Sequence, residues 1–275
     1  MAESRSSPDR LFCALLKFWR GQRGLSQLDL ANAAEVSGRH LSFLETGRAR
    51  PKQEMVLRLC STLSVPMRSQ NELLRAAGFE PMFAEPSWER ELAGPVGRIL
   101  DRMLVQHEPY PMLVMDSLFN VIQQNAATDR LISLAFADPS ALVGPLNIYR
   151  ALVDPALMRP FVVDWEQTTR ALLARLHRQA LANPDKPAFK ELVDELFDYP
   201  DVPQSWRQPD FSVPISALLP LTVARDGLRA SFVSMVTVFS APHNIALEEL
   251  QIESMFPADE ATEQLCARMA QAGAG

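Results

Sequence analysis

Residues 26–48 read SQLDLANAAEVSGRHLSFLETGR, and this stretch decides how the first part of the chain folds. Ser26, followed by Asp29 three residues later, matches the capping-box pattern that begins a helix. Apolar and small residues then recur at helical spacing at Leu28, Leu30, Ala31 and Ala34. Ser37 can cap a second helix, and Gly47 can supply the left-handed residue that ends it. The stretch predicts two short helices joined by a tight turn, a helix-turn-helix.

The second predicted helix has an apolar face and a polar face. Leu41 and Leu44 form the apolar face. The opposite face consists of Arg39, Ser42, Phe43 and Thr46. Arg39 can donate two hydrogen bonds to a guanine, and Phe43 can contact a thymine methyl group. This face predicts a helix that reads bases in the major groove of DNA.

Neighbouring residues are suited to the DNA backbone. Gln27 opens the first helix, where a helix N-terminus and a side-chain amide suit a phosphate. Gly38 leaves room for the backbone to approach DNA, and His40 suits a phosphate or surface role better than a base contact. The residues predicted to contact DNA are Gln27, Ser37, Gly38, Arg39, His40, Ser42, Phe43, Arg48 and Arg50. The alternative is that the two helices belong to a larger bundle whose surface charges only solvate it.

The surrounding sequence resembles the Xre/Cro/phage-repressor helix-turn-helix family over residues 10–66. The resemblance is carried by WRGQRGLSQLDLA and by ETGRARPKQEMVLRLCSTLSVP, on either side of the turn. In that family an arginine of the first helix pairs with the glutamate that ends the recognition helix, which implies a pair between Arg20 and Glu45. Glu45 also falls four residues after Leu41, so it leans towards the core and needs a partner.

Charge is distributed unevenly along the chain. The net charge of −6 argues against nucleic acid by itself. However, residues 1–80 contain 12 Lys and Arg against 8 Asp and Glu, whereas the remainder contains 15 against 25. A basic head on an acidic body is typical of a DNA-binding domain joined to a domain of another kind.

The cysteines and the N-terminus indicate a cellular compartment. The three cysteines are widely spaced and form no CxxC motif, which favours a reducing cytoplasm without structural disulfides. MAESRSSPDR, at the N-terminus, has no apolar segment behind it, so no signal peptide is expected. No apolar run approaches the roughly 20 residues that cross a bilayer, and membrane insertion is not expected.

The chain is long enough for two domains. Residues 1–80 predict a five-helix domain, whose first helix buries Leu11, Leu15, Phe18 and Trp19. Prolines break FEPMFAEPSWER, which places a linker at 81–88. Residues 89–275 form the second predicted domain, which begins with a helix at 89–106.

The second domain is expected to mix strands and helices. MLVMDSLFNVIQQN, at 112–125, predicts two strands across a turn, and a helix follows, the order in which a PAS-like sensor domain begins. Residues 146–199 read as helical. Asp226-Gly227 lies between two β-branched runs and predicts a hairpin, before a last strand and helix. The expected fold class is α+β overall, an all-α helix-turn-helix domain joined to an α+β PAS-like domain with an antiparallel sheet.

A second resemblance covers essentially the whole chain. PMLVMDSLFNVIQQNAA, NIYRALVDP, DWEQTTRALLARL, SFVSMVTVF and LEELQIESMFPADEAT are together similar to the MmyB-like transcription-regulator family. That family couples an Xre-type head to a PAS-like domain that binds a small ligand, with a fatty acid among its ligands. The family pattern often has Asn before the helix tryptophan. This chain has Asp164 there, so no polar ligand contact is carried over to that position.

The second domain offers candidates for a lipophilic pocket. Adaptable apolar side chains suited to such a lining are Met112, Met115, Trp165, Met235 and Phe239. Arg170, one turn beyond Trp165, can meet a carboxylate head group. The alternative is that the apolar residues fill a core and that Arg170 lies on the surface.

Enzyme motifs are missing from the sequence. The four histidines never form HExxH or HxH, and no GxSxG, GKS/T or GxGxxG occurs. His177 reads as a solvated helix residue. We therefore predict no catalytic residue, no metal site and no cofactor apart from a bound fatty acid or similar lipophilic ligand.

Three functions are compared on these grounds. The first is a homodimeric regulator that binds double-stranded DNA and senses a small lipophilic molecule. The second is a DNA-binding regulator whose C-terminal domain only dimerises or binds a protein partner. The third is an enzyme regulated through its DNA-binding head. The residues favour the first, and a continuous apolar cavity would separate it from the second.

Overall fold

The computed structural model of the 275-residue chain describes residues 7–83, 88–184, 186–210, 218–239 and 244–272. The chain divides into two compact units. One comprises residues 1–87 and 241–247, and the other comprises residues 88–240 and 248–275.

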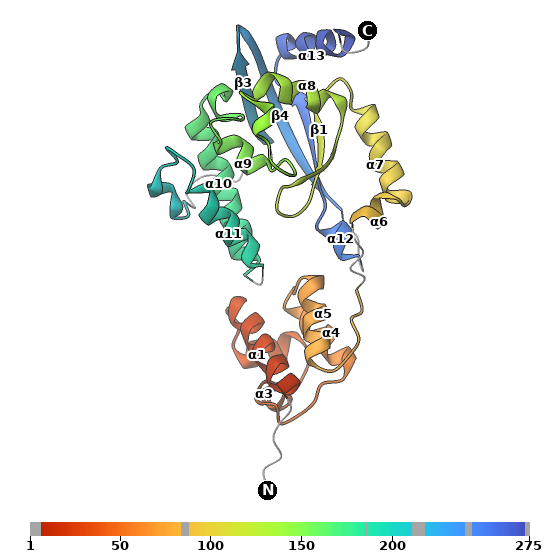
Figure 1. The fold of residues 1–275 in the computed structure, drawn as a ribbon. Coiled ribbons are helices and arrows are strands. Elements are labelled where there is room, and N and C mark those ends of the chain that lie inside the picture. Colours follow the sequence, from red (N-terminus) through yellow and green to blue (C-terminus); the bar gives the residue numbers. More distant parts are fainter. Residues whose placement is uncertain (1–6, 84–87, 185, 211–217, 240–243, 273–275) are drawn as a thin grey trace. The chain divides into compact units, whose positions relative to one another are not determined.

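Residues 7–76 of the first unit form five helices: α1 (Ser7–Gln22), α2 (Gln27–Ala33), α3 (Gly38–Thr46), α4 (Gln53–Thr62) and α5 (Met67–Ala76) (Figure 1). The helix-turn-helix is α2 and α3. Ser26 and Asp29 form the expected capping box at the start of α2. Ser37 caps α3, and Gly47 ends it with a φ of 71°. These short-range predictions are confirmed because each depends on a few adjacent residues.

The buried face of α1 differs from the prediction. Leu11 and Phe18 are 53% and 37% exposed, whereas Phe12, Leu16 and Trp19 are buried. The helix has apolar residues on two adjacent stripes, so periodicity alone does not choose between them. Packing of α1 against α3 and α5 decides the choice. Leu28 of α2, also expected inside, is 64% exposed.

The segment after α5 contains two helices where one was expected. α6 spans Trp88–Leu92 and α7 spans Pro95–Gln106, with Gly94 and Pro95 at the break. Pro95 lacks the N–H that a continuous helix would need, so it begins a new helix. Before them, the Asn71 side chain bonds the backbone of Met82 and Phe83. Residues 84–87 of the predicted linker lie outside the described residues.

A five-stranded antiparallel sheet forms the centre of the second unit. Its strands are β1 (Met112–Met115), β2 (Val121–Gln124), β3 (Leu218–Arg225), β4 (Leu228–Val238) and β5 (Gln251–Pro257), in the order β2-β1-β5-β4-β3. The predicted hairpin joins β3 to β4, with φ of 51° at Asp226 and 80° at Gly227. β5 is the last strand in the chain. It pairs with β1 on one side and with β4 on the other, and so joins the two hairpins into one sheet.

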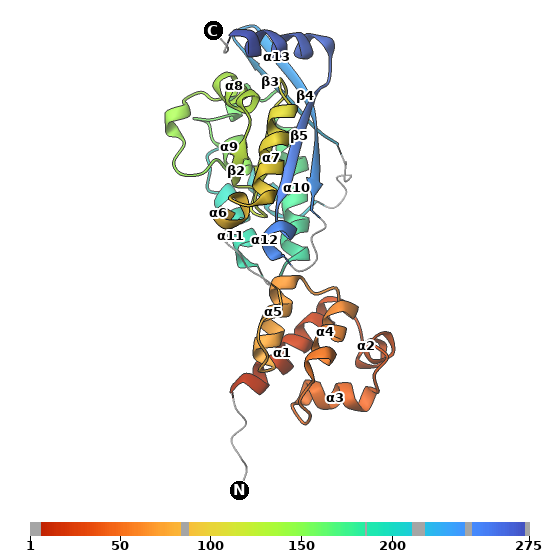
Figure 2. The same cartoon turned by 90° about the vertical axis from the view of Figure 1, so that its right-hand side faces the viewer.

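Helices cover both faces of this sheet. On one face α7 packs Leu100 and Leu104 against Met112, Val114 and Ile252, and Figure 2 shows α7 running along β5. The opposite face carries α8 (Ala126–Ala135), α9 (Ile148–Val153) and α10 (Trp165–Ala182), with α11 (Pro187–Leu196) against α10. α12 (Ile245–Glu248) precedes β5, and α13 (Glu260–Ala272) packs on β4 and α8. Short 3-10 turns lie at Pro139–Ala141, Arg159–Phe161 and Gln204–Arg207.

The two units together give the expected fold class, an all-α helix-turn-helix domain and an α+β domain with an antiparallel sheet. Among the described residues, no helix is both long and apolar enough to cross a membrane. The same residues contain no cluster of three or more His, Cys, Asp or Glu side chains suited to a metal ion.

Candidate nucleic-acid interface and ligand cavity

A buried carboxylate fixes the end of α3 to the rest of its unit. Glu45 is 1% exposed. Arg20 of α1 donates from Nε to Glu45 Oε1 at 2.6 Å and from Nη2 to Oε2 at 3.0 Å, which is the pair that the sequence implied. This hydrogen bonding raises the pKa of Arg20. A bidentate ion pair constrains orientation as well as distance, so α3 is held rigidly against α1.

Gln27 belongs to the same network. Its Nε2 donates to Glu45 Oε2 at 2.7 Å, and the residue is half-buried. One donor of the side-chain amide is therefore used within the protein, and the phosphate contact expected of Gln27 remains a prediction. Sequence spacing did not reveal this role because Gln27 and Glu45 lie 18 positions apart.

The solvent-facing side of α3 is basic and contains an aromatic ring. Arg39 is exposed, and its guanidinium carbon lies 5.3 Å from the centre of the Phe43 ring. The guanidinium carbon of Arg48 lies 5.9 Å from the same ring centre. Both distances are within the range of cation–π attraction. The half-buried Phe43 ring thus lies beside two exposed arginines on one surface.

The other candidate DNA contacts lie on or beside the same helix. Ser37 is used as the cap of α3, where its hydroxyl accepts the His40 backbone N–H. Gly38 has open space where a side chain would stand. Ser42 is half-buried, and Arg50 is exposed just beyond the helix. A direct DNA contact by any of these residues remains a prediction.

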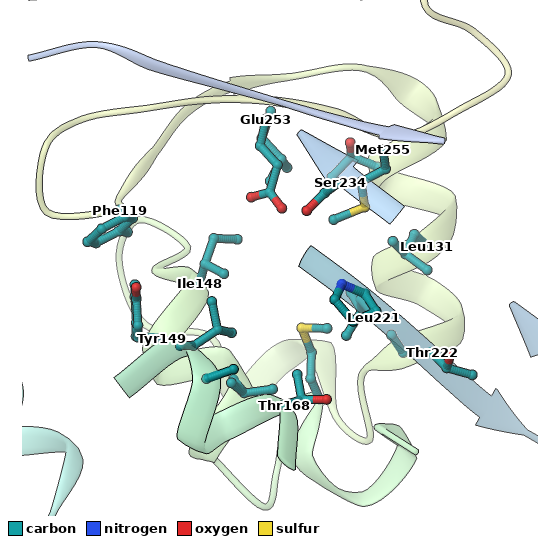
Figure 3. Close-up of a pocket in the computed structure, with 18 of the residues that line it drawn as sticks. Phe119, Leu131, Ile148, Tyr149, Thr168, Leu221, Thr222, Ser234, Glu253 and Met255 are labelled. Atoms are coloured by element: carbon teal, nitrogen blue, oxygen red, sulfur yellow. The ribbon is translucent and has the colours of Figure 1, made fainter. Parts of the chain in front are cut away.

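The second unit contains a cavity of about 310 Å³ between the inner face of the sheet and helices α8, α9 and α10 (Figure 3). Most of its lining is apolar, for example Leu113 and Met115 of β1, Leu131 and Ala135 of α8, and Leu172 of α10. Asp164 and Gln167, at the start of α10, line it and are exposed, so the cavity reaches solvent there. Such a size and lining are typical of small-molecule sites.

A third of the residues that line the cavity are polar or charged, and one of them is a buried acid. Glu253 of β5 is 8% exposed, and burial raises the pKa of its carboxyl group. A hydrogen bond with Ser234 and the charge of Arg175 act in the opposite direction on this pKa. Tyr149 of α9 is 2% exposed, and burial raises the pKa of its phenol. The Tyr149 hydroxyl has no hydrogen-bond partner among the described residues.

Of the residues predicted to bind a lipophilic ligand, Met115 lines the cavity. The others lie outside its lining. Met112 faces α7 on the other side of the sheet, where it packs with Leu100. Met235 is 45% exposed, and Phe239 packs with the α7 cluster. Strand alternation separates two faces correctly, but it does not say which one faces the cavity.

Trp165 and Arg170 also point elsewhere. The indole nitrogen of Trp165 donates to the Leu152 carbonyl at 2.7 Å, and its ring lies against Trp206. Arg170 pairs with Asp210 at 3.1 Å and is half exposed. A different side of α10 lines the cavity, and it is partly polar. Its residues are Gln167, Thr168, Ala171, Leu172 and Arg175. Leu173 and Leu176 of α10 instead belong to a buried cluster with residues of α11.

At two further positions the structure differs from what the sequence predicted. His177, expected to be solvated, is 6% exposed, and burial lowers the pKa of its imidazole. Glu253 was not predicted as a site residue, because polar residues that alternate with apolar ones in a strand are typical of a solvent-exposed face. In QIESMF the residues on one face of the strand are Gln251, Glu253 and Met255, and all three are buried. A buried polar pair on one strand face is unusual unless it serves a site.

Comparisons with known proteins agree with this two-part reading. Residues 96–269, more than half of the chain, match the family described as MmyB-like transcription regulator ligand binding domain. Residues 11–74 match a helix-turn-helix domain family. A search of curated proteins finds no match.

Among solved structures, the chain is similar to one described as an RNA-binding light-oxygen-voltage receptor. The identity is 13%, the TM-score is 0.29, and the match covers 96% of this chain and 64% of the other, so this chain spans less than two thirds of that protein. A likeness at this level supports no argument about function.

Proposed function

The chain belongs to the MmyB-like transcription regulator ligand-binding domain family, and we propose that it is a homodimeric DNA-binding regulator controlled by a small lipophilic molecule. Its helix-turn-helix domain and its ligand-binding domain make it a ligand-responsive transcription regulator. The observation that supports a lipophilic ligand is the cavity of about 310 Å³ with a largely apolar lining. A fatty acid has an apolar chain of suitable character and is the first class to test.

The proposed mechanism is a shift between two arrangements of the dimer. Each protomer would place α3 in a major groove, with half-sites roughly one helical turn apart. A ligand that binds one arrangement more tightly than the other favours that arrangement. The resulting change in DNA affinity is limited by the difference between the ligand's affinities for the two arrangements. Cys13, Cys60 and Cys266 form no disulfide, as expected for a protein of the reducing cytoplasm.

For DNA, the decisive residue is Arg39. Arg39→Ala should weaken specific binding by about 1–3 kcal/mol and relax the preference at one base pair, because a bidentate contact to guanine is lost. The measurement is a competition assay with the selected operator and its single-base variants. Arg58→Ala on α4, which removes an arginine whose partner is Glu54 of the same helix, serves as a control. Unchanged specificity in Arg39→Ala would remove Arg39 from base reading.

For the ligand, the test fills the cavity. Ala135 lines the cavity and is 1% exposed, so the larger side chain of Ala135→Leu would occupy part of the cavity. We expect native mass spectrometry to show a lipid adduct or a fatty-acid adduct on the wild-type chain, reduced about tenfold in this variant, equivalent to roughly 1.4 kcal/mol. Ala182→Leu, at an exposed position of α10, is the matched control. A wild-type chain that takes up no amphiphile and shows no shift in melting would favour a C-terminal domain that only dimerises or binds a protein.

A further inference from the structure

Four polar residues of the cavity lining come from four different elements of the second unit. Glu253 of β5 and Ser234 of the adjacent strand β4 are both buried and both line the cavity. Figure 3 shows the Glu253 carboxyl group pointing into the cavity, with the Ser234 hydroxyl beside it. Tyr149 of α9 and Arg175 of α10 belong to the same lining. Since Arg175 and Glu253 both act on the pKa of Tyr149, these side chains form one polar end of the cavity.

Two hydrogen-bond donors at this polar end have unused capacity. Arg175 is half-buried, and its guanidinium group makes no hydrogen bond or ion pair within the described part of the chain. The Tyr149 hydroxyl is buried and also lacks a partner among those residues. A guanidinium has five N–H donors and no acceptor, and a phenol has one O–H donor. An acceptor with a negative charge would use both donors and also balance the charge of Arg175.

The state of Glu253 determines whether an anion fits beside it. Burial raises the pKa of Glu253, whereas the hydrogen bond with Ser234 and the charge of Arg175 act in the opposite direction. A ligand carboxylate at this end would raise this pKa further, because two like charges in one desolvated site repel each other. One proton is then shared by the two carboxyl groups, and the protonated acid donates a hydrogen bond. Asp164, the other acid of the lining, lies at the solvent-exposed mouth.

We propose that this polar end holds the carboxylate of an amphiphilic ligand, to which Arg175 and Tyr149 donate hydrogen bonds and with which protonated Glu253 shares its proton. The inference rests on the proposed lipophilic ligand and specifies how its polar end is held. Arg170, to which the sequence analysis gave this role, is paired with Asp210. Where Glu253 is ionised in the empty cavity, carboxylate binding takes up one proton from solvent, so the affinity falls as the pH rises.

The test compares three ten-carbon amphiphiles that differ in the head group: decanoate, decanesulfonate and decanol. Each is titrated as a monomer into the delipidated full-length chain at several pH values from about 6 to 9.5, a range that includes the raised pKa values of buried acids, and calorimetry measures the dissociation constants. Decanesulfonate stays ionised throughout, so a change in its affinity reports a proton held by the protein. We expect both anions to lose affinity by up to about tenfold per pH unit, whereas decanol changes far less.

Variants assign this pH dependence to named residues. Glu253→Gln replaces the protonated acid with a permanent donor, so decanoate should bind this variant equally at every pH and as tightly as it binds wild type at the lowest pH. Arg175→Gln should weaken decanoate binding at least about tenfold at the lowest pH, because a charge-assisted hydrogen bond is lost, and leave decanol binding nearly unchanged. Arg98→Gln, exposed on α7, is the matched control and should change neither.

The outcomes separate this inference from the proposed function. Anions that bind the wild-type chain with the same affinity at every pH overturn the shared proton, and an identical pH dependence in wild type and Glu253→Gln removes Glu253 from it. Binding of decanol without binding of either anion overturns the carboxylate site but leaves a lipophilic ligand in place. Failure of all three amphiphiles to bind the wild-type chain overturns both proposals. The decanesulfonate series needs only the wild-type chain, so it decides the question even where the Glu253 variant does not fold.

Discussion

The two units differ in how they treat buried polar groups. In the first, the buried Glu45 accepts hydrogen bonds from Arg20 and Gln27, and buried Asn71 bonds the backbone at Met82 and Phe83. In the second, several buried polar atoms of the described residues have no partner: Gln123 Oε1, Tyr149 Oη, Thr169 Oγ1, His177 Nε2 and Gln251 Oε1. Such atoms are uncommon in folded proteins because each one costs free energy.

This difference fits two different tasks. A helix that reads bases must keep its geometry, and a fully bonded buried carboxylate provides this because any displacement of α3 would leave a charge unpaired. A sensor must respond to its ligand, and a cavity with an unpartnered hydroxyl gains stability when a ligand supplies the missing bond.

The first prediction concerns the satisfied network. Arg20→Ala should lower the free energy of unfolding of the first unit by about 3–5 kcal/mol, because it leaves the buried Glu45 carboxylate without its ionic partner. Hydrogen exchange on the full chain can assign the loss to the first unit. Arg58→Ala removes an exposed pair with Glu54, whose nitrogen and oxygen are 3.5 Å apart, and should cost less than about 0.5 kcal/mol. Equal costs for the two variants would contradict the importance of the network.

The second prediction concerns the buried acid of the cavity. Burial raises the pKa of Glu253 in the folded chain, so folding favours its protonated form, and this contribution is lost as the pH rises above the unfolded value. Glu253→Gln should therefore increase the free energy of unfolding at neutral pH, because the uncharged amide is less costly to bury than an ionised carboxylate.

The gain should vanish below about pH 4, where the carboxyl group of wild type is protonated in both states. Denaturant titrations at the two pH values measure it, with the exposed Glu191→Gln as the control. A variant that is less stable than wild type at neutral pH would show that Glu253 is held by stronger partners than Ser234 and Arg175.

The third prediction concerns the unpartnered hydroxyl. Tyr149→Phe should change the free energy of unfolding of the ligand-free chain by less than about 1 kcal/mol, with stabilisation expected, because the lost hydroxyl makes no bond. Thr128→Val is the contrasting variant, since the Thr128 hydroxyl donates to the Met112 carbonyl and accepts the Met112 N–H, both at 3.1 Å. It should cost about 1–3 kcal/mol. Thermal and denaturant unfolding compare the two, and a large loss in Tyr149→Phe would mean that its hydroxyl is bonded.

Local patterns in the sequence were sufficient for much of the fold. The caps at Ser26 and Ser37, the left-handed Gly47 and the Asp226-Gly227 hairpin were all predicted correctly, because each depends on a few neighbouring residues. The helix-turn-helix and the order of strands and helices in the second unit followed from the same kind of signal. The Arg20–Glu45 pair was reached through family resemblance and the position of Glu45 on its helix.

Local sequence patterns therefore predicted most of the helices and strands, although not the break between α6 and α7, and they predicted that a basic helix-turn-helix domain precedes an acidic domain. Tertiary structure decided which face of each element is buried, as Phe12 in place of Leu11 shows for α1. It also decided which residues line the cavity, because β5 pairs between β1 and β4 and turns Glu253 towards Tyr149 and Arg175, residues distant in sequence. Periodicity reports that a strand has two faces. Only the packing of other elements on those faces determines which one encloses a site.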